Sequence, residues 1–115
     1  MANYLALLSK LEKLNETQTR YETVKFFRSD KVSVWIWVTI LKNHYSKKKQ
    51  NIEDIFRQIP AGFASRPTMF KIMNTALKKK YFFREQDKID KRKYNIYPTN
   101  LTIREFEIWS KKMIN

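Results

Sequence analysis

The sequence predicts a mainly α-helical fold with one small β-hairpin, an α+β arrangement in a single domain. Three observations lead to this prediction. Apolar residues recur at helical spacing over most of the 115 residues. Two short aromatic runs, at 81–85 and 94–97, flank a charged stretch, which is typical of a hairpin. A hydrophobic content of 43%, with 15% aromatic residues, is sufficient for a packed core.

The first predicted segment, residues 1–28, is helical. Apolar residues three or four positions apart give it a 3.5-residue period, which suits a seam against another helix. The seam is formed by Tyr4, Leu7, Leu11 and Leu14, with Leu8 beside them. The sequence leaves open whether this helix ends near Asn15 or continues to Phe27. The sequence does not decide whether this apolar seam packs within the same chain or against the same helix of a second copy; the two are equally supported.

The most apolar run, 34–41, follows two residues that can cap a helix, Asp30 and Ser33. Its alternating β-branched residues suit a buried strand, whereas its length suits a buried helix. Local signals favour neither structure. Two of the three tryptophans lie in this run, and tryptophans are expected in the core rather than stacked on bases.

Two helices separated by a tight turn are predicted next. Asn51 caps the first, which carries apolar residues at 52, 55, 56 and 59 and ends at Pro60 and Gly62. Ser65 opens the second, whose first turn tolerates Pro67. Phe70, Met73 and Leu77 form its apolar stripe, and the opposite face is polar and basic.

The hairpin follows, with a charged tip over 86–92, and Pro98 ends its second strand. A last short helix is predicted from a capping box formed by Thr102 and Glu105. Two helices joined by a short turn and followed by a hairpin outline a winged helix-turn-helix over residues 29–99. The segments 1–28 and 100–115 are candidate dimerisation elements beside it.

The net charge of +13 indicates a polyanionic partner, because a field of this size attracts nucleic acid or an anionic surface. The absence of cysteine, with a single histidine and a single glycine, excludes thiolate sites, histidine clusters and P-loops. The prediction is therefore a non-enzyme with no cofactor and no metal. No membrane-spanning stretch or signal peptide is visible, so a cytoplasmic protein without membrane contact is expected.

The charge is concentrated where a winged helix meets DNA. Residues 65–93 contain ten Lys or Arg and three Asp or Glu, although a solvated helix face beside a solvated loop would look similar. Double-stranded DNA is the expected partner, with the second helix reading bases in the major groove. The candidate contacts of that helix are Ser65, Arg66, Thr68, Lys71, Asn74, Thr75 and Lys78. The candidate contacts of the hairpin tip are Lys88, Lys91, Arg92 and Lys93.

Residues 84–99 resemble the wing of the MarR family of winged-helix transcription regulators. That family has an Arg, then D-x-x-D-R-R, then a strand that ends in Leu-Thr. The register holds at Arg84, Asp87, Asp90, Arg92 and Thr99. Lys91 replaces the first Arg of the pair, Pro98 replaces the Leu, and Lys80 stands where the family usually turns with Gly.

The resemblance implies that the 34–41 run is a buried helix and that the protein is a homodimeric DNA-binding regulator. It implies that Arg84, Asp87 and Asp90 stabilise the wing through charge-assisted hydrogen bonds. It also implies that Arg92 reaches the minor groove, although a pairing with Asp90 is equally supported. Family members often bind a small-molecule effector, but nothing in this sequence supports one. A winged-helix protein-interaction module and a non-specific nucleic-acid binder are the alternatives.

Overall fold

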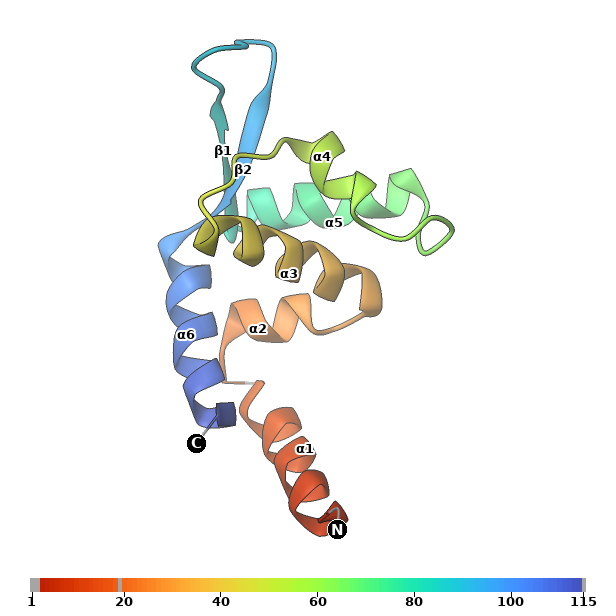
Figure 1. Ribbon diagram of the computed structural model, residues 1–115, viewed down its shortest axis with the longest axis vertical. Helices are drawn as coiled ribbons and strands as arrows, with labels where there is room; N and C mark the ends of the chain where they lie inside the picture. The colour runs from red at the N-terminus through yellow and green to blue at the C-terminus, as the bar shows by residue number, and fades with distance from the viewer. Residues whose placement is uncertain (1–2, 19, 115) are drawn as a thin grey trace.

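The computed structural model describes residues 3–18 and 20–114, so residues 1–2, 19 and 115 of the predicted segments lie outside it. The described chain contains six helices and one antiparallel two-stranded hairpin, which confirms the predicted fold class (Figure 1). In chain order the elements are α1 (Tyr4–Gln18), α2 (Glu22–Phe27), α3 (Lys31–Tyr45), α4 (Ile52–Arg57), α5 (Arg66–Lys78), β1 (Phe82–Gln86), β2 (Tyr94–Pro98) and α6 (Asn100–Ile114).

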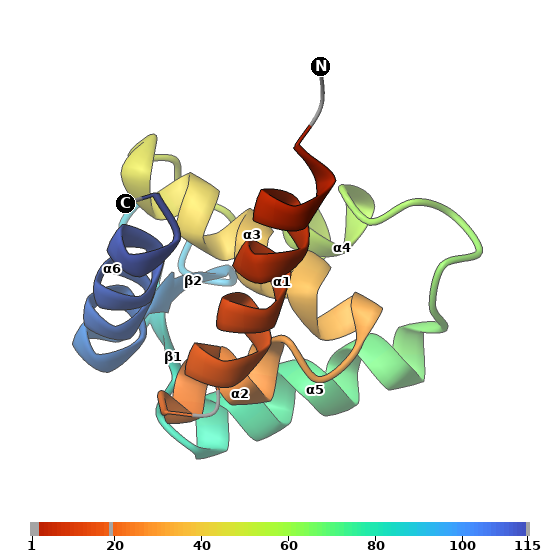
Figure 2. The same ribbon diagram turned by 90° about the horizontal axis from the view of Figure 1, so that it is seen from below.

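The molecule is elongated, with extents of 53 × 31 × 26 Å. The hairpin projects at one end of the long axis and α1 at the other, with α2 to α6 between them (Figure 1). Seen from below, α6 lies along one side of the molecule and α5 along another (Figure 2). The helix with the predicted apolar seam, α1, and the charged hairpin therefore lie at opposite ends of the molecule.

The run at 34–41 is helical and lies at the centre of the core. Asp30 caps α3, since its side chain accepts a hydrogen bond of 2.9 Å from the backbone N–H of Ser33. Ile36, Trp37 and Ile40 are buried, whereas Trp35 is 40% exposed. The expectation that the tryptophans lie in the core is therefore wrong for Trp35, which projects from the outer side of α3.

The core extends into residues 22–27. The first helix ends at Gln18, and the separate helix α2 contributes Val24 and Phe27, both fully buried. The Phe27 ring stacks on Trp37 at 6.1 Å and on Phe82 at 4.8 Å between ring centres. α2 therefore belongs to the same core as the winged helix-turn-helix elements.

The predicted capping box at Thr102 and Glu105 is wrong. α6 begins at Asn100, which places Thr102 inside its first turn, and the Thr102 hydroxyl donates to the carbonyl of Tyr81 at 2.6 Å. Glu105 instead accepts hydrogen bonds from the backbone N–H of Thr23 at 2.9 Å and from its hydroxyl at 2.6 Å. Because Tyr21, the N-cap residue of α2, makes no side-chain cap, Glu105 performs the capping from α6.

Replacing Glu105 by alanine is expected to lower the free energy of unfolding by about 1–3 kcal/mol, since a charge-assisted cap of α2 is lost. Urea denaturation followed by tryptophan fluorescence measures the change. Glu85→Ala on the exposed strand β1 is the matched control and should change stability by less than about 0.5 kcal/mol. Equal stability of the two variants would contradict the capping role.

Two helices end in left-handed residues that are lysines. Lys80 after α5 has φ 63° and Lys47 after α3 has φ 58°. At each end the left-handed residue and its successor donate back to the last turn of the helix. After α5, Lys80 donates to the carbonyl of Leu77 and Tyr81 to that of Ala76. This is the Schellman arrangement, in which glycine is favoured because other residues cost about 1 kcal/mol there.

Tyr81, which follows the left-handed residue Lys80, is hydrogen-bonded through both its hydroxyl and its carbonyl. Its hydroxyl donates to Glu22 of α2 at 3.1 Å, and its carbonyl accepts from the hydroxyl groups of Thr99 and Thr102. Burial, and then the hydrogen bond to Glu22, raise the pKa of Tyr81 to about 12. These hydrogen bonds therefore attach the residue that precedes β1 to both α2 and α6, and so anchor the hairpin to the helical core.

Candidate nucleic-acid interface

The outer face of α5 presents an unpartnered row of polar side chains. Met69, Met73 and Ala76 are buried, which fixes the orientation of the helix about its axis. On the opposite face Lys71, Asn74 and Lys78 are exposed. Within residues 3–18 and 20–114, none of these three side chains forms an ion pair or a side-chain hydrogen bond. Their donors and acceptors are therefore available to a ligand.

The other predicted contacts of this helix have partners within the protein. The Ser65 hydroxyl caps α5 by accepting from the N–H of Thr68, and the two hydroxyl groups lie 2.9 Å apart. Thr75 is half-buried, and its hydroxyl donates to the carbonyl of Lys71 at 2.8 Å. These three residues are exposed or partly exposed, but each hydroxyl already has an intramolecular hydrogen bond.

Arg66 is engaged more strongly. Its guanidinium donates to both carboxylate oxygens of Glu53 in α4, at 2.6 and 3.0 Å, and lies 5.3 Å from the centre of the Phe70 ring. The hydrogen bond from Arg66 lowers the pKa of Glu53, and the same bond raises the pKa of Arg66. The pair joins the first turns of α4 and α5.

The tip of the hairpin is organised by Asp87. Its carboxylate accepts from the backbone N–H groups of Ile89 and Asp90, at 3.0 and 2.8 Å, and from the side-chain amide of Asn95 at 3.0 Å. The backbone N–H of Asp87 donates to the carbonyl of Lys93 at 2.9 Å. Asp87 lies on a surface that is expected to meet phosphate, where an acid would oppose binding. Its role is structural, because its hydrogen bonds close the turn.

The order of the hairpin tip is expected to depend on the ionisation of Asp87. The N–H of Asp90, then the Asn95 amide and the N–H of Ile89, hold the pKa of Asp87 below its ordinary value. The depressed pKa means that this stabilisation is complete above the unfolded-state pKa of about 4 and is lost as pH falls through the lower folded-state pKa. Amide hydrogen exchange at residues 87–93, measured from pH 6 to pH 2, should show the loss. The amides of Ile89 and Asp90, which donate to Asp87, are the diagnostic ones. In Asp87→Asn, protection of these two amides that still falls over the acid range would contradict the assignment to Asp87.

The second wing carboxylate pairs with Arg92. The guanidinium Nε of Arg92 lies 3.2 Å from Asp90, and the backbone N–H of Arg92 donates to the same carboxylate at 3.1 Å. The side chain of Arg92 is 92% exposed, so the pair lies at the surface. The Arg92 hydrogen bond lowers the pKa of Asp90. Both roles considered for Arg92 remain compatible, because a surface pair of this kind is weak and can open.

Arg84 does not make the hydrogen bonds that the resemblance implied. In the described part of the chain it forms no hydrogen bond or ion pair with Asp87 or Asp90, and its guanidinium lies 5.5 Å from the centre of the Tyr94 ring. The cause is the alternation of side chains along a strand. Arg84 lies opposite Ile96 in the register, whereas Asp87 is bonded to Asn95, whose side chain projects from the other side of the strand.

The remaining wing residues form a cationic tip with one apolar residue. Lys88, Lys91 and Lys93 are exposed, and Ile89 between them is 96% exposed. Sequence reasoning missed Ile89, although an isoleucine inside an otherwise charged loop is an identifiable signal. Exposed aliphatic side chains of this kind are the ones that minor-groove proteins insert between base steps.

Other classes of site find no support in the described residues. No group of three or more His, Asp or Glu residues among residues 3–18 and 20–114 could hold a metal ion. Nor does any described helix combine the length and apolar character needed to cross a bilayer. A short helix, a basic helix packed behind it and a charged hairpin together define a winged helix-turn-helix protein.

Comparison with solved structures identifies the type of winged helix. A variant of the S. aureus protein MepR bound to an oligodeoxyribonucleotide has a TM-score of 0.57 and 17% identity, covering 96% of this chain and 76% of that one. The MarR protein from Peptoclostridium difficile has a TM-score of 0.52 and 20% identity, and the match covers 96% of this chain and 67% of that one. The heme sensor protein PefR from Streptococcus agalactiae, in complex with heme, has a TM-score of 0.52 and 19% identity, and the match covers 98% of this chain and 77% of that one. Neither a protein-family model nor a curated protein sequence matches. The chain therefore has the fold of the MarR-family winged-helix regulators.

Proposed function

We propose that this protein is a sequence-specific double-stranded DNA-binding transcription regulator, that it acts as a homodimer in the cytoplasm and that it has no catalytic activity. The observation that carries the proposal is the unpartnered row of Lys71, Asn74 and Lys78 on the outer face of α5, beside a cationic hairpin. The fold adds support, because a MepR variant with this fold binds an oligodeoxyribonucleotide.

The chemistry of the α5 row suits base recognition in the major groove. A lysine ammonium can donate to the O6 and N7 of guanine, and an asparagine amide can pair with the N6 and N7 of adenine. Lys71, Asn74 and Lys78 lie three and four residues apart, so they follow one another along the groove. The hydroxyl groups of Ser65 and Thr68 are already hydrogen-bonded, which makes them secondary contacts.

The hairpin supplies contacts to the DNA backbone and the minor groove. Lys88, Lys91 and Lys93 form no salt bridge within residues 3–18 and 20–114 and can neutralise phosphates. Arg92 is positioned by Asp90 and can exchange that surface pair for a narrow minor groove, whose potential attracts arginine. The wing thus contributes affinity, whereas α5 contributes sequence preference.

The homodimer rests on the apolar stripe of α1, defined by Tyr4, Leu7, Leu8 and Leu11, with Leu14 at its end. The first four residues are between 48% and 72% exposed, and Leu14 is the member that packs on the core. Packing within one chain therefore leaves most of the stripe uncovered. A second copy of the same helix would cover it and would place two α5 helices on one duplex.

Lys71→Ala and Asn74→Ala are expected to relax sequence preference at the base pairs they contact, at a cost of about 1–3 kcal/mol each. Fluorescence anisotropy with a panel of single-substitution duplexes derived from a selected site measures this. Arg92→Ala should weaken binding to every duplex alike. Lys111→Ala, at the end of α6 remote from the hairpin, is the charge-matched control for the Lys71 and Arg92 variants (Figure 1). If the two α5 variants keep the parent's preferences, this assignment of the α5 face is wrong.

A further inference from the structure

A second cationic feature lies between α5 and the hairpin. A groove of about 870 Å³ is bounded by the C-terminal half of α5, by β1 and by the start of α6, and we refer to it as the α5–β1 groove. Its lining contains three cations and no carboxylate, together with three uncharged polar residues and three apolar ones. The cations are Lys78, Lys80 and Arg84, the uncharged polar residues are Asn74, Thr99 and Asn100, and the apolar residues are Leu77, Phe82 and Phe83. In the described part of the chain these three cations form no ion pair. Their charge is therefore uncompensated within the groove.

Lys80 occupies its position at a cost to the backbone. Its φ of 63° lies in the left-handed region, where a side chain beyond glycine is disfavoured. The side chain of Lys80 lines the α5–β1 groove, so the position that glycine would occupy more comfortably instead carries a cation into it.

The neighbours of Lys80 complete a polyanion site. Arg84 is held by the face of the Tyr94 ring, at 5.5 Å from its centre, which limits the orientations of its guanidinium. Asn100 is the first residue of α6, so the positive end of that helix dipole adds to the potential in the groove. Cations from the end of α5, the corner and β1 thus converge on one space.

We propose that the α5–β1 groove binds phosphates of the DNA strand that runs between the two DNA grooves engaged by α5 and the wing, with Lys80 as a principal contact. The inference rests on the proposed function and adds to it. When a helix occupies a major groove and the adjoining hairpin occupies the neighbouring minor groove, one sugar-phosphate strand must pass between them. The α5–β1 groove is the surface between those two elements, and its three cations, with no carboxylate beside them in the lining, can bind phosphate oxygens.

The test uses one substitution whose two effects have opposite directions. Lys80→Gly removes both the strained side chain and the ammonium. It should therefore raise the melting temperature by a few degrees while weakening binding to a mixed-sequence 30-base-pair duplex. The slope of log K against log salt should become shallower by about 0.9, the value for one lost phosphate contact. Lys80→Arg retains the charge and should keep the parent's slope.

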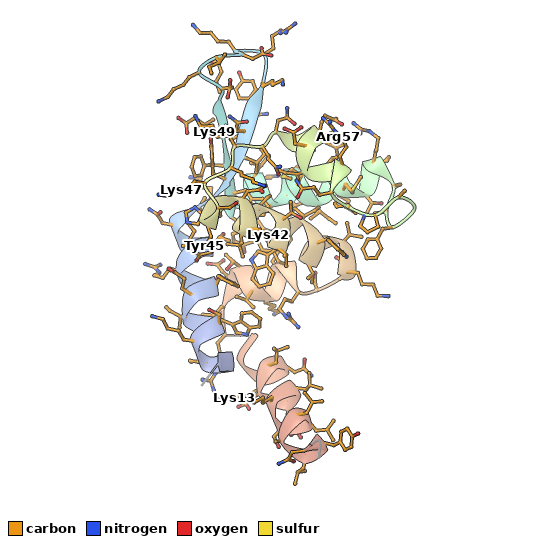
Figure 3. All side chains as sticks on the ribbon, viewed as in Figure 1. Lys13, Lys42, Tyr45, Lys47, Lys49 and Arg57 are labelled. Carbon is orange, nitrogen blue, oxygen red and sulfur yellow. The ribbon has the colours of Figure 1, made fainter. Side chains whose placement is uncertain are left out.

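The chain supplies a matched control in Lys47. Lys47→Gly relieves the same left-handed strain and removes the same charge, at the end of α3. Figure 3 shows Lys47 and Lys49 on the loop that leads to α4, and Lys47 is not part of the lining of the α5–β1 groove. Lys47→Gly should therefore raise the melting temperature as Lys80→Gly does and leave duplex affinity and the salt slope unchanged.

The outcomes separate this inference from the proposed function. If the parent binds the duplex and Lys80→Gly binds with the same affinity and slope, the phosphate site is overturned and the regulator is not. An equal loss of affinity in Lys47→Gly would also overturn it, because the effect would then be one of total charge. If the parent does not bind duplex DNA at all, the proposed function fails and this inference fails with it.

Discussion

Phe27→Ala is expected to lower the free energy of unfolding by about 3–5 kcal/mol. The Phe27 side chain is fully buried, and its ring contacts those of Phe26, Trp37, Tyr81 and Phe82. Truncation would leave a cavity where α2, α3 and the start of β1 meet. A loss of this size is a large part of the stability of a domain of this length, so the variant should be near unfolding at 37 °C. Urea denaturation monitored by circular dichroism measures it.

The matched control for this prediction is Phe83→Ala. Phe83 is 45% exposed on β1, so its truncation removes less buried surface and should cost about 1 kcal/mol or less. A small loss for Phe27→Ala would mean that α2 is an appendage of the winged helix-turn-helix elements. A large loss would establish that residues 22–27 are part of the same cooperative unit.

The second large effect is expected from the α1 stripe. Leu8→Glu combined with Leu11→Glu places two negative charges at the centre of the surface proposed to bind a second copy. Both side chains are about half exposed in a single chain, so each protomer should remain folded. The dimer should dissociate, and affinity for a duplex with two half-sites should fall by about 100-fold or more, because the two α5 helices no longer bind as a linked pair. Light scattering coupled to size exclusion measures the mass, and anisotropy measures the affinity.

Ser9→Glu is the control for the α1 prediction. At about 100° per residue, Ser9 lies about 160° around α1 from Leu11 and about 100° from Leu8, so it projects away from the stripe, and it is exposed. This variant should keep the parent's mass and affinity. A parent protein that is monomeric at micromolar concentration and yet binds the two-half-site duplex as tightly as a linked pair would contradict the role of the stripe.

The helix starts of the turn region could be predicted from sequence because their signals are local. Asn51 and Ser65 each accept a hydrogen bond from the backbone N–H three residues later, so the cap and its partner stand in the same short stretch. The α6 start was misassigned because Thr102 and Glu105 have distant partners, Tyr81 and Thr23. A capping-box pattern carries no information about such contacts.

In the candidate site, too, the features that depend on neighbouring residues could be predicted from sequence, and those that join distant residues could not. The helical period alone placed Lys71, Asn74 and Lys78 on an outer face, and all three are exposed. The pairing of Arg66 with Glu53 joins residues on two different helices and could not be anticipated from either. At Lys80 the resemblance marked a turn that the family usually makes with Gly, and the structure shows a left-handed corner there, with φ 63°. The local sequence alone gives no sign of this corner, since three consecutive lysines look like the continuation of α5.

Selection from a random duplex library at about 0.15 M salt tests whether α5 reads a DNA sequence. At this ionic strength weak binding by charge alone is partly screened. We expect enrichment of one motif with two-fold-related halves, spaced by about one helical turn or a multiple of it. Enrichment that is lost in the Lys71→Ala, Asn74→Ala double variant would assign the reading to α5. Retention of duplex without enrichment of any motif would contradict the claim and leave a charge-driven binder, and no retention would direct the search to protein partners.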